Sequence, residues 1–356
     1  MRVLHVISEM GSGGAETLVA GMVSRGEEYG WTSAVASGGG FRADALAADG
    51  TPTFPVPLAR RSKVGVLKAA WAVRRAIARF RPDVVLAHNV GASVVARLAL
   101  APGRRRPLLT VFHGVAAADY PAAARILRRV SDRVVAVSPA TADRLTASGL
   151  DSPTVVRNAV FARPPVFGRA EVRASLGVPE RTPVALCLAR LEPQKRHDVL
   201  LDAWAAVEGD AVLWLAGDGS LCADLERRSE ALGRRIEFLG TRTDVPDLLA
   251  AADVTVLTSD WEGLPLAVLE SLAAGRPVVA TNVGGIAEVL AGGGGIVVPP
   301  ADPAATAEAL NTLLSDRLTR ESMAAEGLRS IERDYDAHTL MKTYDELLRL
   351  TLGGER

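Results

Sequence analysis

The sequence predicts an α/β protein built from two doubly wound domains that face a cleft. Short runs of β-branched and apolar residues alternate along the chain with longer stretches that have apolar residues at helical spacing. These runs are almost continuously apolar, which is typical of parallel sheets covered by helices on both faces. A chain of 356 residues is also longer than a domain with one hydrophobic core usually is, so two domains are expected.

The two halves of the chain repeat one plan without an aligned repeat. The candidate strands are residues 3–7, 33–37, 84–87, 108–112, 134–137 and 155–156, then 184–189, 212–216, 236–239, 254–257, 278–280 and 296–298. Helical spacing is clearest at 17–29, 63–79, 141–148 and 336–352. In open parallel sheets, ligands bind beyond the carboxyl ends of the strands.

The domain boundary is predicted at residues 162–168, where Arg163-Pro164-Pro165 cannot continue a helix. We therefore predict one Rossmann-like domain over 1–163 and a second Rossmann-like domain over 164–334. A last helix within 335–356 is expected to pack back on the N-terminal domain.

Composition excludes several classes of protein. Only Cys187 and Cys222 occur, which argues against a disulfide framework or a cysteine-rich metal site. The apolar opening of the chain is too short for a signal peptide, and no later run reaches the ~20 residues of a membrane span. A cytoplasmic location follows as the expectation, with peripheral contact to the inner face of the cell membrane as an open possibility.

Charge is divided between the halves although the net charge is zero. Up to Arg163 there are 22 Lys and Arg against 11 Asp and Glu, and beyond it 19 against 30. This asymmetry suggests a different partner for each half. The alternative is that two domains attract each other across a cleft, which salt screening over ~10 Å would weaken.

A glycine-rich turn follows the first candidate strand and precedes a helix. It contains Gly13, Gly14 and Glu16, and its glycines allow close backbone approach beside a helix N-terminus that favours anions. The spacing departs from G-x-G-x-x-G, and no acidic residue lies near residues 37–40, directly after the second strand, to hold a ribose, so a dinucleotide site is disfavoured. A simple tight turn is the alternative.

The strand at 184–189 is followed by Arg190 and Lys195, at the edge of the sheet where a ligand is expected. A guanidinium can hold two phosphate oxygens while an ammonium acts as a point charge, so this pair suits a diphosphate. Solvated surface charges are the alternative.

The strand at 254–257 is followed by Glu262, Gly263, Leu264, Pro265 and Leu266, with Glu270 further along. Pro265 is predicted as the first helical residue. Glu270 then lies about two turns into the helix and roughly 10 Å from Glu262. That span suits two contacts on one extended ligand, with sugar hydroxyls as partners for Glu270, and a salt bridge is the alternative. A third turn, with Gly284 and Gly285, is predicted to offer another anion-accepting helix N-terminus.

These motifs closely resemble those of the retaining GT-B glycosyltransferases of family 4. The resemblance covers nearly the whole chain and is most specific at Arg190/Lys195 and at the Glu-seven residues-Glu pattern of Glu262 and Glu270. It implies that Arg190 and Lys195 hold the donor diphosphate, that Glu262 faces the donor sugar and that Glu270 binds the ribose. Backbone amides of Gly263, Leu264 and Leu266 would contact the sugar or phosphates.

The same resemblance implies roles for the first domain. Gly13 and Gly14 would line the phosphate and acceptor side, and His113, after the strand at 108–112, would lie beside the reacting sugar. A satisfied structural histidine is the alternative for His113. Arg242 would lie near the nucleobase. Many relatives carry His-x-His after the fourth strand, whereas His88-Asn89 keeps one histidine, which leaves the acceptor side open.

The implied activity is retaining transfer of a hexosyl unit from a nucleotide diphosphate-sugar, UDP-linked in the first instance, to a glycan, lipid-linked or small-molecule hydroxyl. No cofactor and no nucleic-acid partner is expected. No metal is expected either, because the only Asp-x-Asp, Asp334-Tyr335-Asp336, lies away from the strand ends. An epimerase or hydrolase and a non-catalytic nucleotide-sugar binder are the alternatives.

The segment 63–79 is predicted to be an amphipathic helix with Lys68, Arg75 and Arg79 opposite its apolar face. Trp71 flanks the basic side, and Arg60, Arg61 and Arg104-Arg105-Arg106 add charge nearby in the sequence. This surface could dock on an anionic membrane at ~1 kcal/mol per basic residue. An ordinary covering helix with a solvated face is the alternative.

Overall fold

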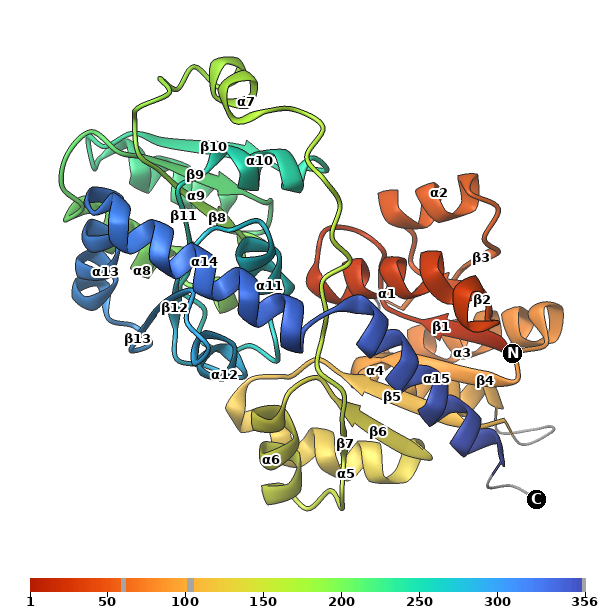
Figure 1. Ribbon diagram of the computed structural model, residues 1–356. Coiled ribbons are helices and arrows are strands. Elements are labelled where there is room, and N and C mark those ends of the chain that lie inside the picture. Colours follow the sequence, from red (N-terminus) through yellow and green to blue (C-terminus); the bar gives the residue numbers. More distant parts are fainter. Residues whose placement is uncertain (59–61, 101–105, 354–356) are drawn as a thin grey trace. The chain divides into compact units, whose positions relative to one another are not determined.

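The structure is a computed structural model that describes residues 1–58, 62–100 and 106–353. Its contacts divide the chain into two compact units (Figure 1). The first unit contains Met1–Ala159 together with Ala337–Arg356, and the second is Val160–Asp336. The last helix therefore belongs to the first unit, although it follows the second unit in the sequence.

The first unit is built on a seven-stranded parallel sheet in the order β3-β2-β1-β4-β5-β6-β7. The strands are β1 Arg2–Val6, β2 Thr32–Ser37, β3 Thr53–Pro55, β4 Val84–His88, β5 Leu108–Phe112, β6 Arg133–Ala136 and β7 Thr154–Val155. The order reverses between β1 and β4, which is the topological switch point of a doubly wound sheet.

Helices cover both faces of this sheet. The α-helices are α1 Gly14–Arg25, α2 Phe41–Ala48, α3 Lys63–Phe80, α4 Asn89–Leu100, α5 Tyr120–Val130, α6 Pro139–Ala147 and α15 Ala337–Gly353, and the 3-10 helices are η1 Gly26–Tyr29 and η2 Ala117–Asp119. Successive strand residues enter different cores: Ala34 and Ala36 of β2 join the core under α3 and α4, while Val35 joins the core under α1 and α2.

The second unit has a six-stranded parallel sheet in the order β10-β9-β8-β11-β12-β13. Its strands are β8 Val184–Leu188, β9 Val212–Ala216, β10 Ile236–Gly240, β11 Val254–Leu257, β12 Val278–Thr281 and β13 Gly295–Val298. The order reverses between β8 and β11. The two sheets confirm the predicted class of two doubly wound parallel domains.

The second sheet is also covered on both faces. Its helices are α7 Arg169–Ser175, η3 Pro193–Lys195, α8 His197–Ala205, α9 Cys222–Glu230, α10 Val245–Ala251, α11 Leu266–Ala273, α12 Ile286–Leu290, α13 Pro303–Ser315 and α14 Arg317–Asp334. Leu213 and Leu215 of β9 enter one core, whereas Val212 and Trp214 enter the other. β9 is therefore apolar on both sides, as its sequence predicts.

One strand was not predicted from the sequence. β3 has three residues, ends at Pro55 and pairs only with β2 at the edge of the sheet. An edge strand tolerates proline because one side of its backbone needs no ladder partner. A run so short, with a proline in it, carries too little periodicity to be recognised.

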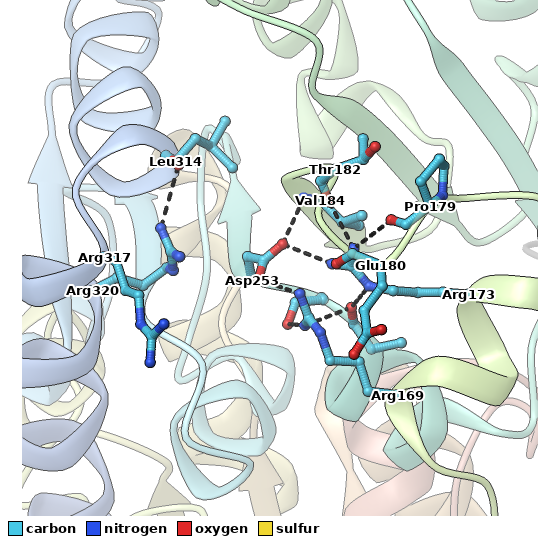
Figure 2. Close-up of polar contacts among 12 residues, drawn as sticks. Arg169, Arg173, Pro179, Glu180, Thr182, Val184, Asp253, Leu314, Arg317 and Arg320 are labelled. Carbon is cyan, nitrogen blue, oxygen red and sulfur yellow. Dashed lines mark hydrogen bonds and ion pairs between the residues drawn. The ribbon is translucent and has the colours of Figure 1, made fainter.

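A buried ion-pair cluster fastens the amino-terminal edge of the second sheet (Figure 2). The Arg173 side chain is 1% exposed, and its guanidinium donates to Asp253 Oδ2 at 2.7 Å and to the carbonyl oxygens of Pro179, Glu180, Thr182 and Ala251. Asp253 also accepts from Val184 N at 2.8 Å and from Arg169 at 2.6 Å. One carboxylate thus joins α7 to the starts of β8 and β11.

The last helix, α15, is fixed to the first unit by apolar and polar contacts. Met341, Tyr344 and Leu348 are buried. Trp31 Nε1 donates to Asp345 Oδ1 at 2.8 Å, and the Tyr29 hydroxyl lies 2.7 Å from His338 Nδ1. The first unit is therefore completed by a segment far away in sequence.

Candidate functional site

A partly buried polar cluster of the second unit lies at the carboxyl ends of β8 and β11. These strands are neighbours at the switch point, so the loops that follow them diverge from the same edge of the sheet. The loop after β8 carries Arg190 and Lys195, and the loop after β11 carries Glu262. The structure thus brings Lys195 and Glu262 together, 67 residues apart in the sequence.

Lys195 Nζ forms an ion pair with Glu262 Oε1, and Ser259 Oγ donates to the same carboxylate oxygen at 2.7 Å. The side chains are 15% and 9% exposed. In such a site charges interact more strongly than in open solvent, and each charge depends on its partner for compensation. The pair leaves one basic and one acidic group at the place where the sequence predicts a diphosphate-sugar.

The two loops are joined by hydrogen bonds to their backbone carbonyl oxygens. Asp260 N donates to Gln194 O at 2.9 Å, and Gln194 Nε2 returns a hydrogen bond to Trp261 O at 2.8 Å. Thr258 Oγ1 donates to Lys195 O at 3.1 Å. These contacts fix Lys195 and Glu262 relative to each other before any ligand arrives, which is what a positioned binding site requires.

Arg190 is exposed, and its surroundings are polar. Hydrogen bonds from the Ser220 N–H and hydroxyl, together with the charge of Arg190, hold the pKa of Glu192 below its ordinary value. Close by, Gly217 has φ +157°, and a Cβ there would lie 1.9 Å from Ala189 O. The loop after β9 therefore needs glycine to lie against the backbone that leads into Arg190.

Two details of the segment after β11 differ from the sequence prediction. Helix α11 begins at Leu266, with Pro265 as its N-cap residue rather than its first helical residue. Glu270 is then the fifth residue of the helix, little more than one turn in, and it is half-buried. Gly263, Leu264 and Leu266 are buried around this turn.

The predicted anion-accepting turn at Gly284 and Gly285 has another role. Gly285 N donates to Gly263 O at 2.8 Å, so this N–H is already used within the protein. Gly284 has φ +57°, and a Cβ there would lie 2.3 Å from Glu262 O. Helix α12 has only five residues. The turn therefore packs against the backbone of the Glu262 loop, and the Gly285 N–H is not available to bind an anion.

Arg242, after β10, is engaged by a neighbour. Its guanidinium binds both carboxylate oxygens of Asp244, and its side chain is 30% exposed. This pair raises the pKa of Arg242 and lowers that of Asp244. The Asp244 carboxylate therefore holds the plane of the Arg242 guanidinium in one orientation.

In the first unit, the glycine-rich turn precedes α1 as predicted. Gly13 is the N-cap residue, and its carbonyl accepts from Thr17 N and Thr17 Oγ1. A Cβ at Gly13 would lie 2.1 Å from Glu16 Oε2. Glu16 thus already places a carboxylate at this helix end, so a further anion beside Gly13 and Gly14 would meet its negative charge.

His113 lies one residue beyond β5 and is half-buried. Its Nε2 is 3.2 Å from His88 Nδ1, and its N–H donates to Asn89 Oδ1 at 3.0 Å. His88 Nε2 in turn lies 3.4 Å from His5 Nδ1. No role was assigned to His5 from the sequence. The pattern that could have indicated one is a single histidine near the end of each of three strands: His5, His88 and His113.

Burial lowers the pKa of His5 and of His113 from 6.5 to about 4, and it lowers the pKa of His88 further with the help of both neighbours. The unfolded histidines take up protons near pH 6.5 while the folded ones stay neutral. We therefore expect the free energy of unfolding to fall as the pH drops from 7 toward 4, by about 2 kcal/mol each for His5 and His113 at pH 5.

Urea titrations at several pH values measure this dependence. A His5→Gln variant should show a weaker loss of stability in acid than the parent protein. An unfolding free energy that stays constant between pH 7 and 5 would contradict the buried neutral histidines.

The described part of the chain contains no group of three or more His, Cys, Asp or Glu side chains arranged to hold a metal ion.

Comparison with known proteins identifies both units. Residues 12–161 match the family described as Glycosyltransferase Family 4, and residues 182–316 match the family described as Glycosyl transferases group 1. Glycogen synthase of Mycobacterium tuberculosis (strain ATCC 25618 / H37Rv) is 30% identical over 308 residues, which are 78% of this chain and 71% of that protein. The lipopolysaccharide core biosynthesis mannosyltransferase LpsB of Rhizobium meliloti (strain 1021) is 29% identical over 265 residues, covering 69% and 74%.

Solved structures share the whole fold. Anabaena HepE in complex with UDP and glucose superposes with a TM-score of 0.83 at 23% identity, over 98% of this chain and 99% of that one. WaaG, a glycosyltransferase involved in lipopolysaccharide biosynthesis, superposes with a TM-score of 0.78 at 18% identity, over 97% and 99%. The neighbours are GT-B glycosyltransferases, so the fold is GT-B.

Proposed function

Because this chain belongs to the group 1, family 4 glycosyltransferases, we propose that it transfers a hexosyl unit from a nucleotide diphosphate-sugar to an acceptor hydroxyl with retention at the anomeric carbon. The observation that carries this proposal is the Lys195–Glu262 pair at the carboxyl ends of β8 and β11. In this pair, the Lys195 ammonium can bind the diphosphate, and the adjacent Glu262 carboxylate can accept hydrogen bonds from the sugar hydroxyls. A UDP-sugar is the first donor to test, since HepE was solved with UDP-glucose.

In this proposal the second unit binds the donor. Lys195 and Arg190 hold the diphosphate and stabilise the charge that develops on the leaving group, which requires positioned charge rather than a protein nucleophile. Glu262 faces the sugar, and Glu270 binds the ribose. The backbone around Gly263 contributes amides, and Arg242, held by Asp244, lies toward the nucleobase.

The first unit is proposed to bind the acceptor. Gly13 and Gly14 bring the backbone close to a ligand, and the nearby Glu16 carboxylate suits a hydroxyl better than a second anion. His113 hydrogen-bonds to the reacting sugar. The acceptor is a glycan, lipid-linked or small-molecule hydroxyl, and in a front-face displacement the departing phosphate helps to deprotonate it.

Acceptor-dependent release of nucleotide diphosphate tests the proposed function. Purified protein is incubated with a panel of nucleotide diphosphate-sugars, first ranked by thermal shift, because a donor at ~100 times its Kd adds roughly 2.7 kcal/mol of stability. Release only in the presence of an acceptor supports transfer. Equal release without acceptor would indicate a hydrolase, and binding with no release under any acceptor would indicate a binder.

Turnover is expected to be independent of added metal, since Lys195 and Arg190 supply positive charge at the diphosphate. The initial rate should be unchanged, within a factor of about two, after dialysis against EDTA. The measurement is nucleotide diphosphate release before dialysis, after dialysis and after addition of Mn²⁺. Loss of activity in EDTA that Mn²⁺ restores would contradict this expectation.

Helix α3 has the amphipathic form that the sequence predicts. Its apolar side is buried, while the side chains of Val64, Leu67 and Trp71 are 63%, 64% and 61% exposed. Lys68 and Arg75 share this outer face, and the Arg75 guanidinium lies 4.8 Å from the Trp71 ring centroid. Of the basic residues expected nearby, Arg60, Arg61, Arg104 and Arg105 lie outside the described residues.

Apolar side chains beside cations form a surface that suits an anionic membrane carrying a lipid-linked acceptor. Within the residues that the structure describes, every helix falls short of the length and apolar character of a membrane span. Contact would therefore be peripheral. We expect the protein to co-sediment with anionic vesicles but not with zwitterionic ones, and the combined Lys68→Glu and Trp71→Glu changes should remove binding. Equal sedimentation with both vesicle types, or none at moderate salt, would contradict membrane docking.

A further inference from the structure

Three histidines form a line across neighbouring strands of the first unit. The ring centroids of His5 and His88 are 5.7 Å apart with an interplanar angle of 17°, and those of His88 and His113 are 5.5 Å apart at 21°. The facing nitrogen pairs are 3.4 Å and 3.2 Å apart. The geometry is that of two successive N–H···N hydrogen bonds between nearly parallel rings.

Strand register produces this line. His5 of β1 pairs with Leu86 of β4, and His88 lies two residues further toward the carboxyl edge. His88 pairs with Val111 of β5, and His113 again lies two residues further. Steps of two residues keep side chains on one face of a sheet. The line therefore runs diagonally from the core to the edge at which ligands bind in such folds.

The two ends of the line are different. His5 is fully buried, and no described residue forms a hydrogen bond with its Nε2. His113 is half-buried at the carboxyl edge, where its backbone N–H is held by Asn89 Oδ1. Asn89 itself has φ +71°, and its carbonyl accepts from Ser93 Oγ at 2.8 Å. His113 is thus anchored through its ring and through its backbone.

A neutral imidazole has one N–H, so the line can be arranged in two ways. In one, each N–H points inward and His5 Nε2 carries a buried proton that has no acceptor. In the other, each N–H points outward and His5 Nε2 keeps only an unshared electron pair. Buried N–H groups without an acceptor are rarer than acceptors without a donor, so the outward arrangement is favoured.

We propose that His5 and His88 are positioning residues that hold His113 in the tautomer protonated on Nδ1. His113 then donates a hydrogen bond from Nδ1 to a hydroxyl or phosphoryl oxygen of a ligand at this edge. The identity of that ligand rests on the proposed glycosyl transfer, whereas the tautomer does not.

Nitrogen NMR of the full chain labelled with ¹⁵N-histidine tests the tautomer without any substrate. The chain has five histidines, which single His→Gln variants assign. At pH 7.5 we expect His113 Nδ1 to give a protonated, pyrrole-type signal and His113 Nε2 a pyridine-type signal. The opposite pattern, or an equal mixture, would overturn the proposal, whether or not the protein is active.

A variant series tests the relay itself. Glutamine has one acceptor and one donor at its end, so His88→Gln can replace both bonds of His88, whereas His88→Leu can replace neither. We expect His88→Leu to give a mixed His113 tautomer and a kcat about tenfold lower, as for loss of one hydrogen bond, with donor KM unchanged. His88→Gln should restore much of both.

His5→Phe keeps an aromatic ring but removes the inner donor. It should also shift the His113 signals toward a mixture, because nothing then fixes the direction of the remaining bond. Unchanged His113 signals in His5→Phe and in His88→Leu would overturn the relay. If a variant fails to fold, the spectrum of the parent protein still decides the tautomer.

Discussion

Replacing Lys195 with alanine is expected to lower kcat/KM for the donor by roughly 10²–10³-fold, the loss typical of removing one group that stabilises developing negative charge. Lys195 Nζ is the cation joined to Glu262 at the ends of β8 and β11. Without it, the leaving diphosphate meets the carboxylate of Glu262 with Arg190 as the remaining opposing charge. Initial rates at saturating acceptor and varied donor measure the effect.

Loss of Lys195 also leaves Glu262 buried without its partner, so stability must be separated from catalysis. The double variant Lys195→Ala/Glu262→Gln removes both charges and should recover thermal stability without recovering turnover. Lys342→Ala changes an exposed lysine of α15 and serves as the matched control. Turnover of Lys195→Ala within a factor of a few of the parent would remove the diphosphate assignment.

Replacing Asp253 with asparagine is expected to destabilise the second unit by about 3 kcal/mol or more, because Arg173 would keep its charge in the core with no counter-charge. Burial lowers the pKa of Arg173 whereas the Asp253 carboxylate raises it. The Arg169 guanidinium loses the same partner. Urea unfolding followed by tryptophan fluorescence reports the change, since Trp204 and Trp214 are buried in this unit.

A surface ion pair gives the matched control for Asp253. Asp202 pairs with Arg228, and both side chains are exposed. Asp202→Asn should therefore change the free energy of unfolding by less than about 1 kcal/mol. Asp253 precedes β11, at the sheet edge opposite the loop that carries Glu262. Donor KM should consequently be unaffected at temperatures where the variant is folded, and equal destabilisation by both variants would contradict the buried cluster.

The central strands, such as β4, β5 and β9, were predictable because they are buried on both faces and read as apolar runs. The loops that carry Arg190, Lys195 and Glu262 were predictable because parallel strands present their following loops at one edge. The Lys195–Glu262 ion pair itself was not predicted, since sequence spacing does not show which loops lie on adjacent strands.

The features that were missed depend on contacts between distant residues. Arg173, in a seven-residue helix, reads as a solvated surface charge, and only the fold reveals the five oxygen acceptors around it. In the sequence, His5 is an isolated polar residue in a strand. Only the register of β1 and β4 shows that its side chain lies beside that of His88. The turn at Gly284 and Gly285 was predicted to accept an anion, and the sequence does not show that the Gly285 N–H already donates to Gly263 O on another loop.

The place of α15 in the first unit has a consequence for how the protein is made. The second unit is an insertion in the first, and its ends meet, since Val160 forms a bridge with Asp336 and Val160 N donates to Tyr335 O at 3.1 Å. A ribosome therefore releases the partners of Trp31 and Tyr29 after the whole second unit. The second unit can fold while the first unit still lacks α15, so the first unit begins before the second and is completed after it.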